Sequence, residues 1–281
     1  MTRPTLCGLG AILLWGFLAY LATRAARLPP IQITALCFAI AGSVSLAIVA
    51  ARGRLHLLRQ PVRAWALGLF GMAGYHVVYF AAFAQAPAVE VNLVTYLWPL
   101  LIVLFAAPLL GARLGLPQLA GALLAFTGCV LAIGGAARFD PAHGVGYALG
   151  LAAALIWSLY SLLSRRMAEV PNEAVAGFCA ATAVVTGLMQ FLAEDWITPT
   201  PAEWAVLALL GAGPLGIAFF LWDVGMKRGD VQLIGTLAYA TPVLSTLVLM
   251  AFGATPFAWT VILAALLVGG GGVLAARPSS P

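Results

Sequence analysis

Long apolar stretches fill this chain, and short polar, charged or proline-rich breaks separate them. A hydrocarbon core about 30 Å thick is crossed by about 20 residues of helix, and each stretch has roughly that length. The pattern therefore predicts an all-α polytopic membrane protein with ten transmembrane helices. We place them at residues 5–26, 31–51, 64–85, 88–110, 116–136, 144–165, 174–193, 203–226, 231–252 and 257–276.

The fourth stretch carries polar, aromatic and proline residues where lipid-facing residues should be apolar. Residues 92–99 read Asn-Leu-Val-Thr-Tyr-Leu-Trp-Pro, and Pro99 is the midpoint of the predicted helix 88–110. Proline removes a backbone hydrogen bond, so we expect a kink at this point. Polar groups at such depth face a cavity or a neighbouring helix, because lipid cannot satisfy them. The pattern predicts a transporter built around this break.

Composition and charge support a membrane protein and set its orientation. The chain is 63% hydrophobic and only 8% charged, whereas soluble proteins have about 25% charged residues. The basic residues are spread along the chain, so the net charge of +5 does not indicate nucleic-acid binding. With the N-terminus in the cytoplasm, eleven of the fourteen basic residues lie inside, and only Arg24, Arg27 and Arg138 lie outside. This positive-inside pattern predicts that both termini are cytoplasmic.

The chain lacks the residue clusters that enzymes and metal proteins need. The four cysteines lie singly in apolar surroundings and read as small hydrophobic residues, with no disulfide framework. There are three histidines and no His-Glu-x-x-His pattern, and no phosphate-binding loop for ATP occurs. We therefore expect no cofactor, no metal and no enzymatic activity. A non-transporting membrane scaffold or receptor stays open as an alternative.

The second half of the chain repeats residues of the first half. The matched pairs are Trp15 with Trp157, Tyr96 with Tyr239, and Pro99 with Pro242. We expect two five-helix repeats, residues 1–137 and 138–281, within one membrane unit. Because five is odd, each helix and its counterpart cross the bilayer in opposite directions. Inverted repeats of this kind are typical of transporters that alternate access to a site at the midplane.

Several short motifs recur in an order that resembles a known family. They are Leu14-Trp15-Gly16, Leu28-Pro29-Pro30, Tyr96-Leu97-Trp98-Pro99, and Pro117-Gln118-Leu119-Ala120-Gly121 followed by Gly128. The chain resembles the drug/metabolite transporter superfamily in its ten-helix EamA-like branch, and within it the aromatic amino acid exporters. The resemblance implies a secondary transporter in the bacterial inner membrane that exports aromatic and other apolar amino acids or related metabolites. Export of a different metabolite or drug is the alternative within the superfamily.

The chain also departs from the family pattern at charged positions. Gly111-Ala112 and Gly253-Ala254 stand where the family often has a glutamate after the glycine. Cys37 stands where an arginine is frequent, and the first predicted helix lacks the embedded glutamate of the small multidrug exporters. These departures put a carboxylate-based proton exchange in doubt.

Aromatic and polar residues at helical spacing are the candidate substrate contacts. Tyr75, His76 and Tyr79 share a face of the third predicted helix. The full candidate set is Trp15, Tyr75, His76, Tyr79, Asn92, Tyr96, Trp98, Trp157, Tyr160 and Tyr239. Helix-to-helix hydrogen bonding or core packing is the alternative for each. The sequence indicates binding of a small molecule within the lipid bilayer, and it is compatible with a monomer without fixing the oligomeric state.

Two prolines and one acid complete the prediction. Pro99 and Pro242 are the expected helix breaks and gating points, and the carbonyl groups they free, with His76, are expected to meet a zwitterionic substrate. Asp223 is a candidate proton or charge relay, and a local ion pair with Lys227 one turn later is the alternative.

Overall fold

The structure is a computed structural model, and it describes residues 1–133 and 137–277. Within these residues, nine helical segments are long and apolar enough to cross a membrane, and a tenth apolar helix spans Trp259–Ala275. The prediction of an all-α polytopic membrane protein is confirmed. Observed and predicted boundaries agree within a few residues at most ends; residues 134–136 of the predicted fifth helix lie outside the described residues.

Several membrane crossings consist of two or three helical pieces. The first half contains α1 (Arg3–Gly16), α2 (Leu18–Thr23), α3 (Pro30–Ala51), η1 (Leu55–Leu58), α4 (Val62–Leu69), η2 (Phe70–Gly74), α5 (Tyr75–Phe83), α6 (Ala88–Thr95), α7 (Trp98–Leu110) and α8 (Leu116–Ile133). The second half contains η3 (Pro141–His143), α9 (Gly144–Arg166), α10 (Ala174–Ala193), α11 (Pro201–Ala212), η4 (Gly213–Ile217), α12 (Ala218–Arg228), α13 (Val231–Leu237), α14 (Ala240–Ala251) and α15 (Trp259–Ala275).

The helices are interrupted at matching places in the two halves. Pro99 follows the break between α6 and α7, and Pro242 follows the break between α13 and α14. Each proline lacks an N–H group and so cannot complete the preceding turn. The π-helical turns η2 and η4 interrupt the third and eighth crossings. Such turns leave carbonyl groups without their usual helical partners, and they are frequent at functional sites.

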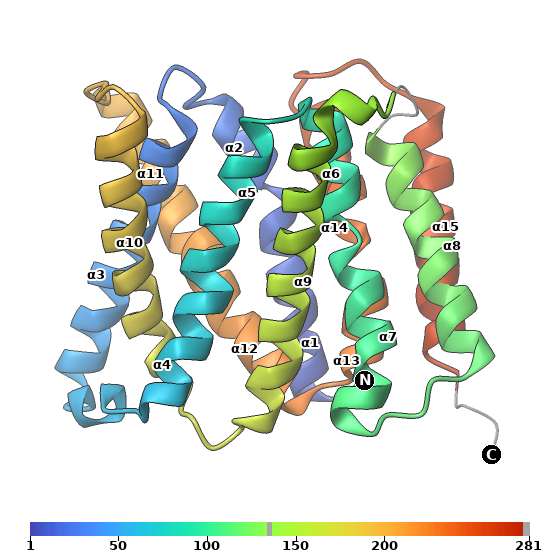
Figure 1. Ribbon diagram of the computed structural model, residues 1–281, viewed down its shortest axis with the longest axis horizontal. Coiled ribbons are helices and arrows are strands. Elements are labelled where there is room, and N and C mark those ends of the chain that lie inside the picture. The colour runs from blue at the N-terminus through green and yellow to red at the C-terminus, as the bar shows by residue number, and fades with distance from the viewer. Residues whose placement is uncertain (134–136, 278–281) are drawn as a thin grey trace.

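Helices of the two halves pack against one another throughout the molecule. In Figure 1, α3 and α10 form one flank, α8 and α15 form the other, and α1, α12, α5, α9 and α7 fill the centre. The contacts pair α1 with α12 and with α14, and pair α9 with α5 and with α7. The first helix of each half thus lies against the third and fourth crossings of the other half.

Glycine permits the closest of these approaches. A Cβ atom on Gly42 of α3 would lie 2.8 Å from the backbone N and Cα of Ala180 in α10. A backbone cannot retreat as a flexible side chain can, so α3 and α10 need glycine at this position to reach their observed separation.

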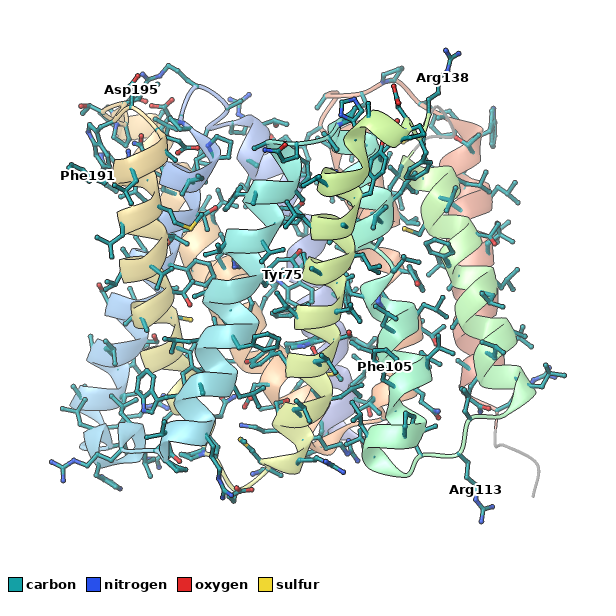
Figure 2. All side chains as sticks on the ribbon, viewed as in Figure 1. Tyr75, Phe105, Arg113, Arg138, Phe191 and Asp195 are labelled. Atoms are coloured by element: carbon teal, nitrogen blue, oxygen red, sulfur yellow. The ribbon has the colours of Figure 1, made fainter. Side chains whose placement is uncertain are left out.

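Charged side chains project from the two edges of the molecule where the membrane-crossing helices end. Arg113 projects from one edge, whereas Arg138 and Asp195 project from the opposite one (Figure 2). We refer to these as the Arg113 edge and the Arg138 edge. α1 begins and α15 ends at the Arg113 edge (Figure 1). Tyr75 lies between the two edges at about mid-height.

Candidate functional site

A cavity of about 400 Å³ lies among the central helices. It is lined by residues of both halves: Trp15, Leu18, Ala19, Tyr75, His76, Tyr79, Asn92, Thr95, Tyr96, Trp98, Ala132, Ile133, Trp157, Leu215, Phe219, Thr241, Pro242, Ser245 and Thr246. None of these described lining residues carries a carboxylate, an ammonium or a guanidinium group. The cavity therefore offers aromatic faces and neutral polar groups to whatever occupies it.

The structure brings eight of the ten candidate contacts to this cavity. They are Trp15, Tyr75, His76, Tyr79, Asn92, Tyr96, Trp98 and Trp157, and Pro242 joins them. They come from α1, α5, α6, α7, α9, α14 and the break between α6 and α7, so the helices of both halves must assemble before the cavity exists. Their role as substrate contacts stays a prediction.

Two of the candidate contacts and one of the expected helix breaks lie outside the lining. Tyr160 is 4% exposed, and its ring fills the space where Gly71 lacks a side chain. Tyr239 is fully buried, and its hydroxyl accepts a hydrogen bond from the Leu100 amide at 3.0 Å. Pro99 is also buried, and its carbonyl lies against Gly235 of α13. Sequence position placed these residues near the helix breaks and the cavity, but tertiary packing directs their side chains into contacts with neighbouring helices.

Three tryptophans of the lining, Trp15, Trp98 and Trp157, pack on the buried Trp222 of α12, which does not itself line the cavity; α12 runs toward the Arg113 edge (Figure 1). Trp15 lies 5.9 Å from Trp157 and 5.1 Å from Trp222 between ring centroids. Trp98 lies 5.6 Å from Trp222. We call Trp15, Trp98, Trp157 and Trp222 the tryptophan floor. Offset and edge-to-face rings at these distances attract one another beyond simple burial, so the floor is a compact closure on one side of the cavity.

Carbonyl groups of the π-helical turns hold two of the lining side chains. Trp15 Nε1 donates to the Pro214 carbonyl at 3.0 Å, and His76 Nδ1 lies 2.7 Å from the Met72 carbonyl. Because a carbonyl can only accept, His76 Nδ1 carries a proton. In the neutral imidazole Nε2 is then a hydrogen-bond acceptor. Each π-helical turn therefore orients one side chain at the cavity.

Two buried threonine hydroxyl groups at the cavity make no hydrogen bond to any described residue. Thr95 and Thr241 are 3% and 9% exposed, and their Oγ1 atoms have no partner. By contrast, the Tyr79 hydroxyl donates to Asn92 Oδ1 at 3.1 Å and ties α5 to α6. Buried hydroxyl groups without partners are uncommon in proteins. Among the described residues, those of Thr95 and Thr241 lie at the cavity, whereas those of Thr236 and Thr255 lie outside its lining.

Asp223 belongs to a separate buried network below the tryptophan floor. Its carboxylate lies 2.9 Å from Lys227 Nζ and accepts a hydrogen bond from Asn172 Nδ2 at 3.0 Å. Lys227 also donates to the Val170 carbonyl at 2.9 Å. Asp223 does not line the cavity. The structure thus contains the local ion pair expected as the alternative, and the relay function stays a prediction.

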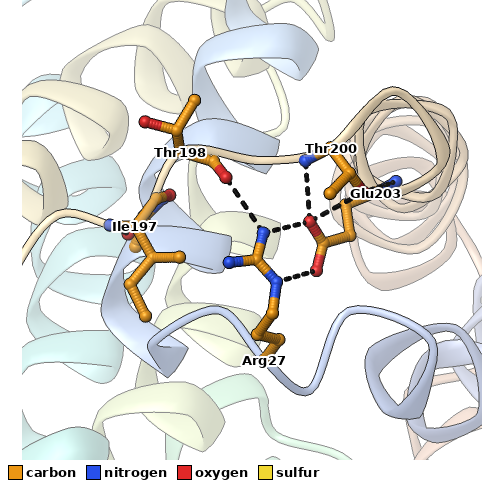
Figure 3. A network of polar contacts seen from close by, with 6 residues as sticks. Arg27, Ile197, Thr198, Thr200 and Glu203 are labelled. Atoms are coloured by element: carbon orange, nitrogen blue, oxygen red, sulfur yellow. Dashed lines mark hydrogen bonds and ion pairs between the residues drawn. The ribbon is translucent and has the colours of Figure 1, made fainter.

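A further polar network ties the two halves at the Arg138 edge (Figure 3). The Arg27 guanidinium donates to both carboxylate oxygens of Glu203, at 3.0 and 2.6 Å, and to the Thr198 carbonyl. Glu203 also accepts a hydrogen bond from the backbone amide of Thr200, the residue that caps the N-terminus of α11. The hydrogen bond to Glu203 raises the pKa of Arg27, although desolvation opposes the rise. The network anchors the loop after α2 on the start of α11.

Sequence reasoning missed part of the lining and of the floor. Thr241, Ser245 and Thr246 line the cavity from α14, and Trp222 completes the floor. Thr241 lies directly before Pro242, and Ser245 lies less than one helical turn after it, so helical spacing around Pro242 carried a usable signal. Trp222 carried none, because a lone tryptophan in an apolar helix has no preferred face.

Comparison with protein families and curated proteins places the chain among transporters. The model of the EamA-like transporter family matches residues 3–134 and again residues 144–277. The chain is 50% identical over 277 residues to the aromatic amino acid exporter YddG of Ancylobacter novellus, covering 97% of this chain and 96% of that protein. It is 28% identical over 292 residues to the aromatic amino acid exporter YddG of Escherichia coli strain K12, covering 98% and 97%.

A more distant relative and a solved structure extend the comparison. The chain is 28% identical over 246 residues to a probable terminal-alkyne amino-acid exporter of Streptantibioticus cattleyicolor, covering 81% of each protein. A solved crystal structure matches with a TM-score of 0.93 and 47% identity, and 98% of each chain is covered. The fold therefore agrees with an experimentally observed architecture over nearly the whole chain.

Proposed function

The chain belongs to the EamA-like transporter family, and from this premise we propose that it exports aromatic and other apolar amino acids. The observation that carries the proposal is the cavity of about 400 Å³, walled by tyrosine and tryptophan rings from both halves. A relative at 50% identity over nearly the whole chain is named an aromatic amino acid exporter, which supports the same substrate class.

The cavity chemistry fits an amino acid better than a charged metabolite. Aromatic walls attract an apolar or aromatic side chain through burial and through edge-to-face contacts. A zwitterion has no net charge, so it needs hydrogen-bonding groups more than a counter-ion. Hydroxyl groups of Thr95 and Thr241 and the Nε2 atom of His76 are such groups. Amino acid transport involves no chemical conversion, so the proposal requires no catalytic residue.

Alternating access by two inverted repeats is the mechanism that we infer. Two separate matches of one family model, at residues 3–134 and 144–277, support repeats at 1–137 and 138–281. Reciprocal packing of α1 and α9, each against the other half, also supports them. The cavity reaches from the tryptophan floor to Ile133, near the Arg138 edge. With both termini in the cytoplasm of a bacterial inner membrane, that edge is external, and the floor is the inner gate.

Transport into liposomes tests the proposal directly. Purified protein is reconstituted, and uptake of labelled phenylalanine and tryptophan is compared with uptake into empty liposomes. We expect saturable uptake that unlabelled phenylalanine competes away. The comparison variant carries Trp98→Ala and Trp157→Ala together, which opens the tryptophan floor. Its uptake of labelled amino acid should no longer saturate. Uptake equal to that of empty liposomes with folded wild-type protein refutes the proposal.

Export of a different amino-acid-like metabolite is the second candidate function. It is favoured by the similarity to a probable terminal-alkyne amino-acid exporter. Competition in the same liposomes separates the two candidates. Stronger inhibition by a short alkynyl amino acid than by phenylalanine would favour the second candidate.

A further inference from the structure

The Tyr239 hydroxyl reaches across the molecule into the break between α6 and α7. It accepts a hydrogen bond from the Leu100 amide at 3.0 Å, over a sequence separation of 139 residues. Tyr239 is fully buried and packs against Phe126 at 5.6 Å between ring centroids. A tyrosine held in this way cannot contact a ligand, so its function must be exerted through the backbone that it binds.

This hydrogen bond leaves the Tyr96 carbonyl without a donor. In a continuous helix that carbonyl would accept from the amide of residue 100, or of residue 99 in a tighter turn. Pro99 has no N–H group, and the Leu100 N–H is occupied by Tyr239. Tyr96 is the residue directly after α6, with φ −66° and ψ 6°, outside helical geometry. No described group donates to this carbonyl in place of the two that are lost.

The surroundings of this carbonyl favour a cation. Helix carbonyl groups point toward the C-terminus and give it partial negative charge, and α6 ends at Thr95, beside the cavity. The Thr95 hydroxyl, 3% exposed, is a second polar group without a partner at the same helix end. The described lining contains no carboxylate that would compete for a cation.

We propose that the Tyr96 backbone carbonyl binds the ammonium group of the transported amino acid, and that Tyr239 is a positioning residue that keeps this carbonyl free. The inference rests on the proposed export of amino acids and specifies how their common end is recognised. The cation is recognised by backbone, and the aromatic walls are left to recognise the side chain. Without the Tyr239 hydroxyl, the Leu100 N–H can donate to the Tyr96 carbonyl. That carbonyl is then no longer available to the ammonium group.

Three ligands with the same ring isolate the ammonium group. Phenylalanine carries ammonium and carboxylate, phenethylamine carries only ammonium, and 3-phenylpropionate carries only carboxylate. Dissociation constants are measured for wild type and for Tyr239→Phe, which keeps the ring. A hydrogen bond to a charged group contributes enough for about a tenfold to hundredfold change in affinity. We expect Tyr239→Phe to lower the affinity for phenylalanine and for phenethylamine by that factor. The affinity for 3-phenylpropionate should stay within twofold of the wild-type value.

The matched control is Tyr147→Phe. The Tyr147 hydroxyl also accepts a backbone amide hydrogen bond, from Asp140 at 3.2 Å, but Tyr147 does not line the cavity. This control should leave all three affinities unchanged. The proposal is overturned if Tyr239→Phe lowers the affinity for all three ligands equally, or if it lowers none of them. Failure of wild type to bind or transport phenylalanine would instead overturn the proposed function.

A spectroscopic measurement avoids dependence on the variant. Protein labelled with ¹³C at the tyrosine carbonyl carbons is studied by infrared difference spectroscopy. Phenethylamine should shift one labelled amide band to lower frequency, because a carbonyl that accepts from an ammonium group is weakened. A spectrum that 3-phenylpropionate changes in the same way, or that neither ligand changes, contradicts direct binding at Tyr96.

Discussion

A substitution that removes the charge of Asp223 and keeps the shape of its side chain should destabilise the protein strongly. The side chains of Asp223 and Lys227 are 4% and 7% exposed, with 2.9 Å between Oδ1 and Nζ. Asp223→Asn preserves volume and the contact with Asn172, but it leaves the Lys227 ammonium without its counter-ion. Removal of one partner from a buried ion pair costs about 3–5 kcal/mol, because the remaining charge stays desolvated. We expect a loss of stability in that range.

The double variant Asp223→Asn with Lys227→Met provides the sharper measurement. It removes both charges and keeps a long flexible side chain at residue 227, so most of the lost stability should return. Unfolding in mixed detergent micelles, followed by tryptophan fluorescence, gives the free energy for wild type, both single variants and the double variant. The coupling free energy from this cycle should be about 2 kcal/mol or more. Single variants that each cost less than about 1 kcal/mol and add independently would refute a desolvated pair.

The same variant tests whether Asp223 relays protons. Asp223 lies outside the cavity lining, and its carboxylate is occupied by Lys227 and Asn172. We therefore expect reconstituted Asp223→Asn to retain the wild-type dependence of transport on pH, even though its stability falls. A flattened pH profile at unchanged protein folding would restore Asp223 to the mechanism.

Three further predictions follow from particular contacts. Tyr75→Leu removes a cavity ring and should weaken phenylalanine binding about two- to twelvefold, the worth of one aromatic contact, in the liposome assay. Gly42→Ala places a methyl group 2.8 Å from the α10 backbone and should destabilise by about 1–3 kcal/mol, whereas Gly187→Ala, with nothing within 4 Å, should be neutral or stabilising in the same unfolding measurement. The pKa of the Glu173 carboxyl is lowered from 4.5, first by a hydrogen bond from its own backbone amide and further by Arg54, so its stabilisation is present above pH 4.5 and is lost as the pH falls through the lowered pKa. Arg54→Gln should therefore reduce the melting temperature slightly at pH 7 and less at pH 3, and an effect that grows toward low pH would contradict this assignment.

The membrane architecture could be predicted from the sequence because it depends on local properties. Hydropathy fixes how many residues lie in the hydrocarbon core, and a proline fixes where a backbone hydrogen bond is missing. The break near Pro99, and the depth of Tyr75 and Trp98, follow from position within a stretch of known length. The matched breaks at Pro99 and Pro242 were also visible without any tertiary contact.

Which rings face the cavity was decided by tertiary packing. A helix that is apolar on all sides has little amphipathic signal, so spacing alone did not separate Trp157, which lines the cavity, from Tyr160, which fills the space beside Gly71. The sequence by itself determined the spans, the breaks and the aromatic content of this protein. Contacts between distant residues, such as Tyr239 with Leu100, decided which groups are left free for a ligand, because a hydrogen bond satisfied across 139 residues is invisible to any local pattern.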